Sequence, residues 1–180
     1  MSLQDTVTKQ YVSDPKVFAD AFNYLIYNGE QVIRPEHLTD LDATQFAIPY
    51  REDDEGRPEA TQKYRDVLKT LAVKTDEYCT YLVLGIENQS NVHYAMPVRN
   101  MLYDAMQYEK QVRQLAAAHR KKHDAATSDE YLSGMSREDK ITPVITLVIN
   151  FGSKRWDGPL SLYEMMPEQP AKVKAFVQDY

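Results

Sequence analysis

The segment that most constrains this chain is the apolar run at residues 78–90, which reads YCTYLVLGIENQS. A nearly unbroken apolar run of this length predicts a strand that is buried on both faces. The run ends in a carboxylate, Glu87, followed two positions later by the amide of Gln89. Positions two apart on a strand share a face and lie roughly 7 Å apart at the backbone. Because a charge at the end of a buried strand is costly unless it is paired or binds a metal, Glu87 is a candidate functional residue.

A second strand is predicted immediately before this run, at residues 65–74, and a short polar turn at 75–77 joins the two. So tight a connection indicates an antiparallel hairpin, in which the start of the first strand lies beside the end of the second. Asp66 and Glu87 are therefore expected close together. Two such carboxylates suit a hard cation such as Mg²⁺, which can polarise a phosphoryl oxygen and lower the pKa of bound water.

The alternative is that both acids form ordinary ion pairs. Asp66 has Lys63, Arg65 and Lys69 within three positions of it, and Glu87 can pair with a lysine from elsewhere in the chain. The spacing alone favours these ion pairs over a metal site.

Two helices are predicted on either side of the hairpin. Residues 15–27 follow a helix N-cap, Asp14, and end at Asn28-Gly29, a helix stop signal. Residues 94–119 carry apolar side chains at intervals of three and four, as an amphipathic helix does. The apolar positions are Val98, Met101, Leu102, Ala105, Met106, Val112, Leu115 and Ala116.

The remaining segments complete the predicted order. A weak strand is expected near residues 45–48, polar loops at 51–63 and 124–140, and another buried strand at 141–151. The order of helix, strand, hairpin, helix and strand predicts one α/β domain over residues 1–180, with a mixed central sheet flanked by helices.

Composition narrows the class of protein. The 180 residues, 43% apolar and 27% charged, are ordinary for one soluble globular domain. No run is long enough to span a bilayer, and no signal-peptide pattern is visible at the N-terminus. The single cysteine, Cys79, excludes an internal disulfide and a cysteine-based zinc site. A cytoplasmic protein without a membrane partner is expected.

Charge is unevenly distributed along the chain. The net charge of −6 argues against a surface that binds nucleic acid everywhere, but not against a local basic stripe. The candidate nucleic-acid contacts all lie on the second predicted helix: Arg99, Lys110, Arg113, Arg120, Lys121 and Lys122. For the last three, compensation of the helix dipole is an equally good explanation. For Arg99, a surface ion pair is an equally good explanation.

Other candidates are weaker. His119 and His123 lie four apart on a helix, but they have no third metal ligand nearby in sequence. Trp156, within FGSKRWDGP, is expected to pack in a turn, with a base-stacking platform as the alternative. Glu30 and Glu36 could extend a metal site, although an exposed loop is the favoured interpretation.

Four segments together resemble a known family. They are YRDVL at 64–68, YLVLGIENQS at 81–90, MPVRNMLYDAMQY at 96–108 and TPVITLVINFG at 142–152. In this order they resemble the recombination-promoting nuclease/transposase family of the PD-(D/E)XK superfamily, over nearly the whole chain from about residue 11. The resemblance implies the restriction-endonuclease-like fold.

The resemblance also implies roles for individual residues. Asp66 matches the metal-binding aspartate, Glu87 matches the second acid, and Gln89 stands where most of the superfamily has lysine. Glutamine donates and accepts hydrogen bonds but carries no charge. The proline that names the motif is absent, since Arg65 precedes Asp66. The implied cofactor is Mg²⁺, with Mn²⁺ as a substitute, and the implied partner is DNA; a homodimer is left open.

The function implied is a Mg²⁺-dependent DNA endonuclease that hydrolyses phosphodiester bonds with a metal-activated water, linked to recombination or mobile elements. The alternative is a catalytically inactive nuclease-fold module that binds DNA or protein. Members of the family are generally longer, so a further C-terminal helical region is expected that this chain lacks.

Overall fold

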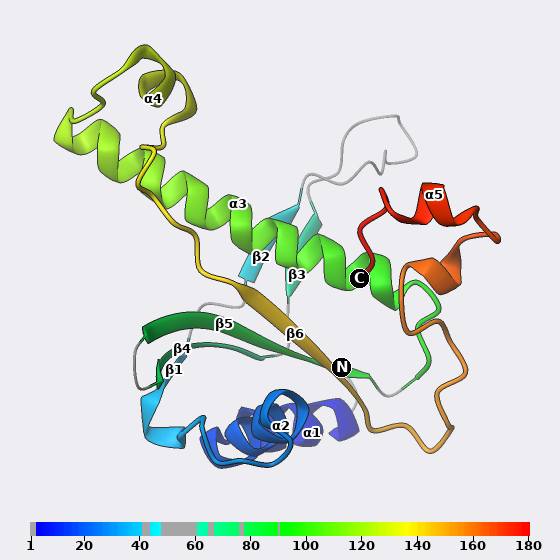
Figure 1. The fold of residues 1–180 in the computed structure, drawn as a ribbon. Helices are drawn as coiled ribbons and strands as arrows, with labels where there is room; N and C mark the ends of the chain where they lie inside the picture. Colours follow the sequence, from blue (N-terminus) through cyan, green and yellow to red (C-terminus); the bar gives the residue numbers. More distant parts are fainter. Residues whose placement is uncertain (1–2, 41–43, 48–60, 65–66, 76–77, 90) are drawn as a thin grey trace.

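The centre of the molecule is a four-stranded mixed sheet (Figure 1). The computed structural model describes residues 3–40, 44–47, 61–64, 67–75, 78–89 and 91–180, with side chains over 6–40 and 91–180. The strand order is β1 (Leu38–Asp40), β4 (Val67–Thr75), β5 (Tyr78–Gln89) and β6 (Val144–Asn150). β4 is antiparallel to both of its neighbours, whereas β5 and β6 are parallel.

The predicted hairpin is formed by β4 and β5. Thr75 pairs with Tyr78 at the turn, and Val67 pairs with Ile86 at the other end. Glu87 is thus the first position of β5 beyond the stretch that pairs with β4. Asp66 lies outside the described residues, so its proximity to Glu87 stays a prediction.

A separate two-stranded hairpin consists of β2 (Thr44–Ala47) and β3 (Thr61–Tyr64), with Thr44 opposite Tyr64. β2 confirms the weak strand predicted near 45–48. The loop predicted at 51–63 is wrong at its end, because residues 61–63 pair with β2 through their backbones. The rest of that loop lies outside the described residues.

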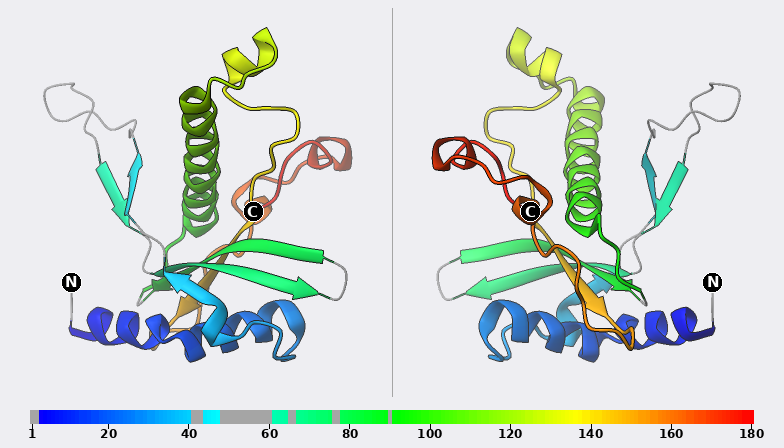
Figure 2. Two further views of the ribbon diagram at one scale, coloured as in Figure 1. Left: turned by 90° about the vertical axis from the view of Figure 1, so that its left-hand side faces the viewer. Right: turned by 90° about the vertical axis from the view of Figure 1, so that its right-hand side faces the viewer.

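Two helices cover one face of the sheet (Figure 2). α2 (Pro15–Tyr27) begins and ends as predicted: the Asp14 carboxylate accepts a hydrogen bond from the Lys16 amide at 2.8 Å, and Asn28 adopts the left-handed conformation with φ of 52°. α1 (Leu3–Ser13) was not predicted, because its apolar residues are too few and too weakly periodic.

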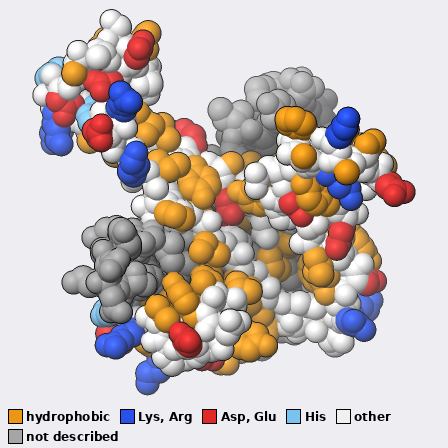
Figure 3. All heavy atoms as spheres, viewed as in Figure 1, with side chains coloured by type: hydrophobic (Ala, Val, Ile, Leu, Met, Phe, Trp, Pro, Cys, Tyr) orange, Lys and Arg blue, Asp and Glu red, His pale blue; other side chains and the backbone are white. Residues whose placement is uncertain are grey.

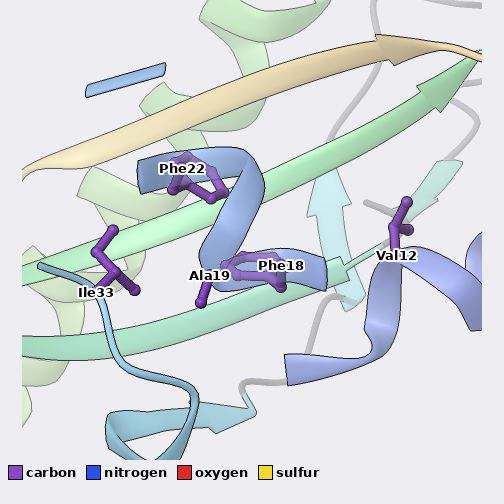
Figure 4. Close-up of a cluster of buried hydrophobic side chains, with 5 residues drawn as sticks. All are labelled: Val12, Phe18, Ala19, Phe22 and Ile33. Carbon is purple, nitrogen blue, oxygen red and sulfur yellow. The ribbon is translucent and has the colours of Figure 1, made fainter. Parts of the chain in front are cut away.

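The core lies between these helices and β6 (Figure 4). Phe18 and Phe22, one turn apart on α2, are fully buried, with ring centroids 5.0 Å apart. Alternate positions of β6 and the residue after it pack against this cluster: Ile145, Leu147, Ile149 and Phe151. Because strand side chains alternate between faces, the even positions of β6 belong to the opposite face.

A buried asparagine fixes the chain that follows α2. Asn23 is fully buried, and its amide accepts a hydrogen bond from the Ile33 amide at 2.7 Å and donates one to the Ile33 carbonyl at 2.9 Å. The Asn23 side chain therefore pairs with the backbone of Ile33 as a neighbouring strand would, and this pairing holds Ile33 in the core. Nothing in the helical pattern of residues 15–27 distinguished Asn23 from a surface residue.

The long helix α3 (Met96–Lys122) confirms the prediction at 94–119. It lies on the other side of the sheet, where it packs on β6, and its C-terminal end projects away from the sheet (Figures 1 and 2). Its contact with β6 and the segment before it is polar. Thr146 donates to the Asp104 carboxylate at 2.6 Å, and the Gln111 amide exchanges two hydrogen bonds with the Thr142 backbone. The buried residues of α3 are Met96, Pro97, Tyr103, Asp104, Gln107 and Ala116.

The apolar face predicted for this helix is therefore partly wrong. Val98 is 39% exposed, and Ala105 is exposed as well. The buried face includes Asp104, because the even positions of β6 include Thr146, whose hydroxyl needs a polar partner. Gln107 is buried on this face as well. Apolar spacing alone does not reveal a face that is buried through hydrogen bonds.

The polar loop predicted at 124–140 contains a short helix, α4 (Ser128–Ser133). Thr127 accepts a hydrogen bond from the Glu130 amide, and the Glu130 carboxylate accepts one from the Ala126 amide, an arrangement close to a capping box. The helix ends at Gly134, whose φ is 70° and where an added Cβ would lie 2.6 Å from the Ala116 Cβ. Close contact with α3 thus requires glycine here.

The C-terminal segment folds back on itself through the short helices η2 (Tyr163–Met165) and α5 (Ala171–Lys174). The Tyr163 hydroxyl donates to the carbonyls of Lys174 and Val177, and the Leu162 amide donates to the Tyr180 carbonyl. A third short helix, η1 (Pro35–His37), precedes β1. Of the helices in the described residues, none has both the length and the apolar character that a membrane span requires.

Candidate functional site

The candidate site lies where the parallel strands β5 and β6 end. Their register places Glu87 beside Val148, and Gln89 beside Asn150. Register partners in a parallel pair belong to the same face of the sheet, here the set of positions that includes Thr146. Since Thr146 bonds to Asp104 of α3, positions 87 and 89 belong to the α3 face of the sheet.

A cavity of about 240 Å³ opens beside these positions, between the start of α3 and the chain that follows β6. Val148 and Asn150 form one wall, directly next to the register positions of Glu87 and Gln89. The other lining residues are Met96, Pro97 and Asn100 of α3, then Trp156, Pro159, Leu160 and Tyr180.

Hydrogen bonds from β6 and from the chain before α3 hold the segment after β6 in place. Asn150 donates from Nδ2 to the Lys154 carbonyl at 3.1 Å and accepts from the Gly152 amide at 3.0 Å. The Tyr94 hydroxyl donates to the Asp157 carboxylate at 3.2 Å, whose negative charge raises the pKa of Tyr94. These bonds tie the turn that carries Trp156 to the chain entering α3.

Two buried polar atoms on the cavity residues have no hydrogen-bond partner among the described residues. They are Oδ1 of Asn100, an acceptor, and Nε1 of Trp156, a donor. Leaving such an atom unpaired costs about 1–3 kcal/mol unless a ligand or water supplies the partner. Both atoms are buried beneath the surface of the cavity residues, and Nε1 of Trp156 lies close to Gly158.

Arg99 is the predicted basic residue nearest to this cavity in sequence, one position before Asn100. Its Nε donates to the Tyr103 hydroxyl at 3.0 Å, and its guanidinium lies 5.4 Å from the centre of the same ring. Tyr103 is 1% exposed, so the contact anchors Arg99 in a fixed position.

The other predicted basic residues lie progressively farther along α3. Arg120, Lys121 and Lys122 are in its last turn, about 30 Å from Arg99 at 1.5 Å per residue. Arg113 forms an ion pair with Glu109 one turn earlier. The structure thus brings Arg99, but not the terminal cluster, to the same end of α3 as the cavity; the terminal cluster lies at the projecting end that carries α4 (Figure 3).

A second cluster of charged groups occupies that projecting end. His119 lies between two carboxylates, with Nδ1 2.7 Å from Asp124 and Nε2 2.9 Å from Asp139. Only a doubly protonated imidazole can donate to both. These hydrogen bonds raise the pKa of His119, while the pKa of Asp124 is lowered chiefly by His119 and that of Asp139 chiefly by the Ser136 amide.

This cluster predicts a pH-dependent stability. A raised histidine pKa contributes stability that is complete below the unfolded value of about 6.5 and is lost as the pH rises through the folded value. The lowered aspartate values contribute above about 3.9 and are lost in acid. Melting temperatures of the protein and of His119→Gln should therefore differ most near pH 5–6 and converge towards pH 9. A difference that grows above pH 7 would contradict the doubly hydrogen-bonded imidazolium.

In the described parts of the chain, no group of three or more His, Cys, Asp or Glu residues is placed to hold a metal ion. Asp66, the predicted partner of Glu87, lies outside those parts. Mg²⁺ commonly binds through one or two carboxylates with water and phosphate completing its shell, so the oxygen donors of Glu87 and Asp66 fit it chemically.

Sequence patterns did not predict the cavity or single out Asn100. The only signals were a Trp beside Lys154 and Arg155 in a turn, and an amide one position after Arg99. Neither signal indicates that the turn with Trp156 lies beside Asn100. The two segments come together because β5 and β6, which the intervening α3 connects, pair in the sheet.

Comparisons with family models, with curated proteins and with solved structures find no match for this chain.

Proposed function

We propose that this chain is a divalent-metal-dependent nuclease that hydrolyses phosphodiester bonds in DNA, with its site at the ends of β5 and β6. The observation that carries the proposal is the register of these strands. It sets Glu87 and Gln89 next to Val148 and Asn150, at the wall of the cavity. The proposal of a nuclease family with the restriction-endonuclease-like fold rests on the resemblance of four sequence segments.

The residues have distinct roles in this proposal. Glu87 and Asp66 hold Mg²⁺ through carboxylate oxygens, the ligand type that this ion prefers. The bound ion supplies Lewis acidity towards the phosphate and a lowered pKa for water. Gln89, an uncharged donor and acceptor, orients the attacking water or the scissile phosphate by hydrogen bonding.

Cations near the cavity support DNA as the substrate despite the net charge of −6. Arg99 is anchored on Tyr103 at the start of α3, and Lys154 and Arg155 are exposed on the turn that carries Trp156. Phosphate contacts by such side chains supply most of the affinity for nucleic acid, and salt weakens them.

The test is cleavage of plasmid and of single-stranded DNA. We expect nicking or degradation with Mg²⁺ or Mn²⁺, and none when EDTA removes the metal, because activation of water depends on the ion. Activity that survives EDTA would refute metal dependence. Binding of DNA without cleavage under any of these metals would favour the inactive nuclease-fold module.

A further inference from the structure

We infer that the cavity at the start of α3 receives one unpaired base of a DNA strand, so that the substrate is single-stranded or locally opened DNA. The inference rests on the proposed function and specifies its substrate. It concerns binding alone, and it can be tested without metal and without cleavage.

The size and lining of the cavity suit a single ring system. Its 240 Å³ is below the roughly 300–1,000 Å³ of pockets that enclose drug-sized ligands, so a base fits while sugar and phosphate stay outside. Among the described residues that line it, no side chain carries a charge. The described walls therefore suit a neutral planar ring.

The walls of the cavity supply the stacking surfaces that proteins use to bind an extruded base. Trp156 and Tyr180 are aromatic, and Met96, Pro97 and Val148 are apolar. Bases stack on such surfaces in single-strand and base-flipping proteins. Trp156 therefore takes the role of a base platform in addition to packing in its turn.

One lining residue supplies a polar group as well. Asn100 carries a side-chain amide, which can donate and accept hydrogen bonds. Each nucleobase presents donors and acceptors side by side on its Watson–Crick edge, which paired DNA keeps occupied. An unpaired base can bond to such an amide, whereas an aliphatic ligand of the same size cannot.

The cavity lies next to the proposed metal site. Val148 lines the cavity and is the register neighbour of Glu87 on β5. A nucleotide with its base in the cavity keeps its phosphates outside, at the strand ends where positions 87 and 89 lie. Base capture would thus hold one backbone segment beside the proposed metal site.

Trp156 is the only tryptophan of the chain, so its fluorescence reports on this cavity directly. The experiment titrates the full chain in EDTA with a single-stranded oligonucleotide, the corresponding duplex, an abasic oligonucleotide and adenosine monophosphate. We expect the single strand to quench Trp156, the duplex to do so only at higher concentration, and the abasic strand to bind without quenching.

Two variants test where the base binds. Val148→Phe fills the cavity and should weaken single-strand binding about 5- to 150-fold, the range expected when one base–aromatic stack is lost. Val173→Phe, at a site 44% exposed outside the cavity, is the matched control and should bind as the parent does. Asn100→Ala provides a second variant that removes the lining amide without adding bulk, and it should weaken binding in the same direction.

Several outcomes would overturn the inference. They are equal quenching by the abasic strand, unchanged single-strand affinity in both Val148→Phe and Asn100→Ala, or no binding of single strands at all. Tighter binding of adenosine monophosphate than of the strand would assign the cavity to a free nucleotide instead. Because Glu87→Gln should keep the quenching, failure of the proposed nuclease activity and failure of this inference are distinguishable.

Discussion

Replacing Glu87 by glutamine should lower DNA cleavage by about 100-fold or more, since loss of a metal ligand removes several kcal/mol of transition-state stabilisation. The substitution preserves the size of the side chain and removes only its charge. Position 87 follows the last β4–β5 pair, so the strand pairing that precedes it should persist. The measurement is the initial rate of plasmid nicking at fixed Mg²⁺, with the melting temperature as a check on folding.

The matched control is Glu138→Gln, an exposed acid in the segment after α4, at the other end of α3. Its cleavage rate should equal that of the parent protein. Equal rates for Glu87→Gln and the parent would show that Glu87 takes no part in hydrolysis, and the proposed site would then be wrong.

Truncating Phe22 to alanine should lower the free energy of unfolding by about 3–5 kcal/mol, a large share of the roughly 5–15 kcal/mol available to a domain. Phe22 is fully buried, and its ring packs on Phe18 between α2 and the odd-numbered positions of β6. Its removal leaves a cavity under the strand that carries Val148 and Asn150. Urea denaturation followed by circular dichroism measures the change.

Phe176→Ala supplies the comparison, because that ring is 92% exposed. Its midpoint in urea should shift little, since the ring buries almost no surface in the folded chain. Similar losses in the two variants would mean that the cluster around α2 is not the main source of stability.

Local signals predicted much of the backbone. Helix α2 follows from its Asp14 cap and its Asn28 stop, and the β4–β5 hairpin follows from two apolar runs separated by a short turn. These features depend on neighbouring residues, which is why the order of amino acids is sufficient to predict them. The restriction-endonuclease-like assignment stays a prediction that rests on sequence resemblance.

The features that the sequence did not predict depend on contacts between distant segments. Asn23 is buried because Ile33, ten positions later, presents both backbone groups to it. Asp104 is buried because Thr146 donates to it across α3 and β6. Helix propensity and apolar spacing carry no information about such partners.

The candidate site was likewise predicted only where its residues belong to one local segment. Glu87 and Gln89 were identified from one strand, because an isolated charge at the end of an apolar run is visible locally. The cavity was not, since its walls come from α3, β6, the turn with Trp156 and the segment ending at Tyr180. Only the parallel pairing of β5 and β6 brings these parts beside Glu87.

In the proposed site, Glu87 binds a divalent metal at the ends of β5 and β6. Anomalous X-ray scattering from crystals soaked in Mn²⁺, the substitute for Mg²⁺, tests this directly. We expect an anomalous peak about 2.0–2.3 Å from a Glu87 carboxylate oxygen, in the range of oxygen ligands to such ions, with Asp66 as a second ligand. Crystals with Mn²⁺ bound elsewhere, or with Glu87 in an ion pair with a lysine, would contradict it.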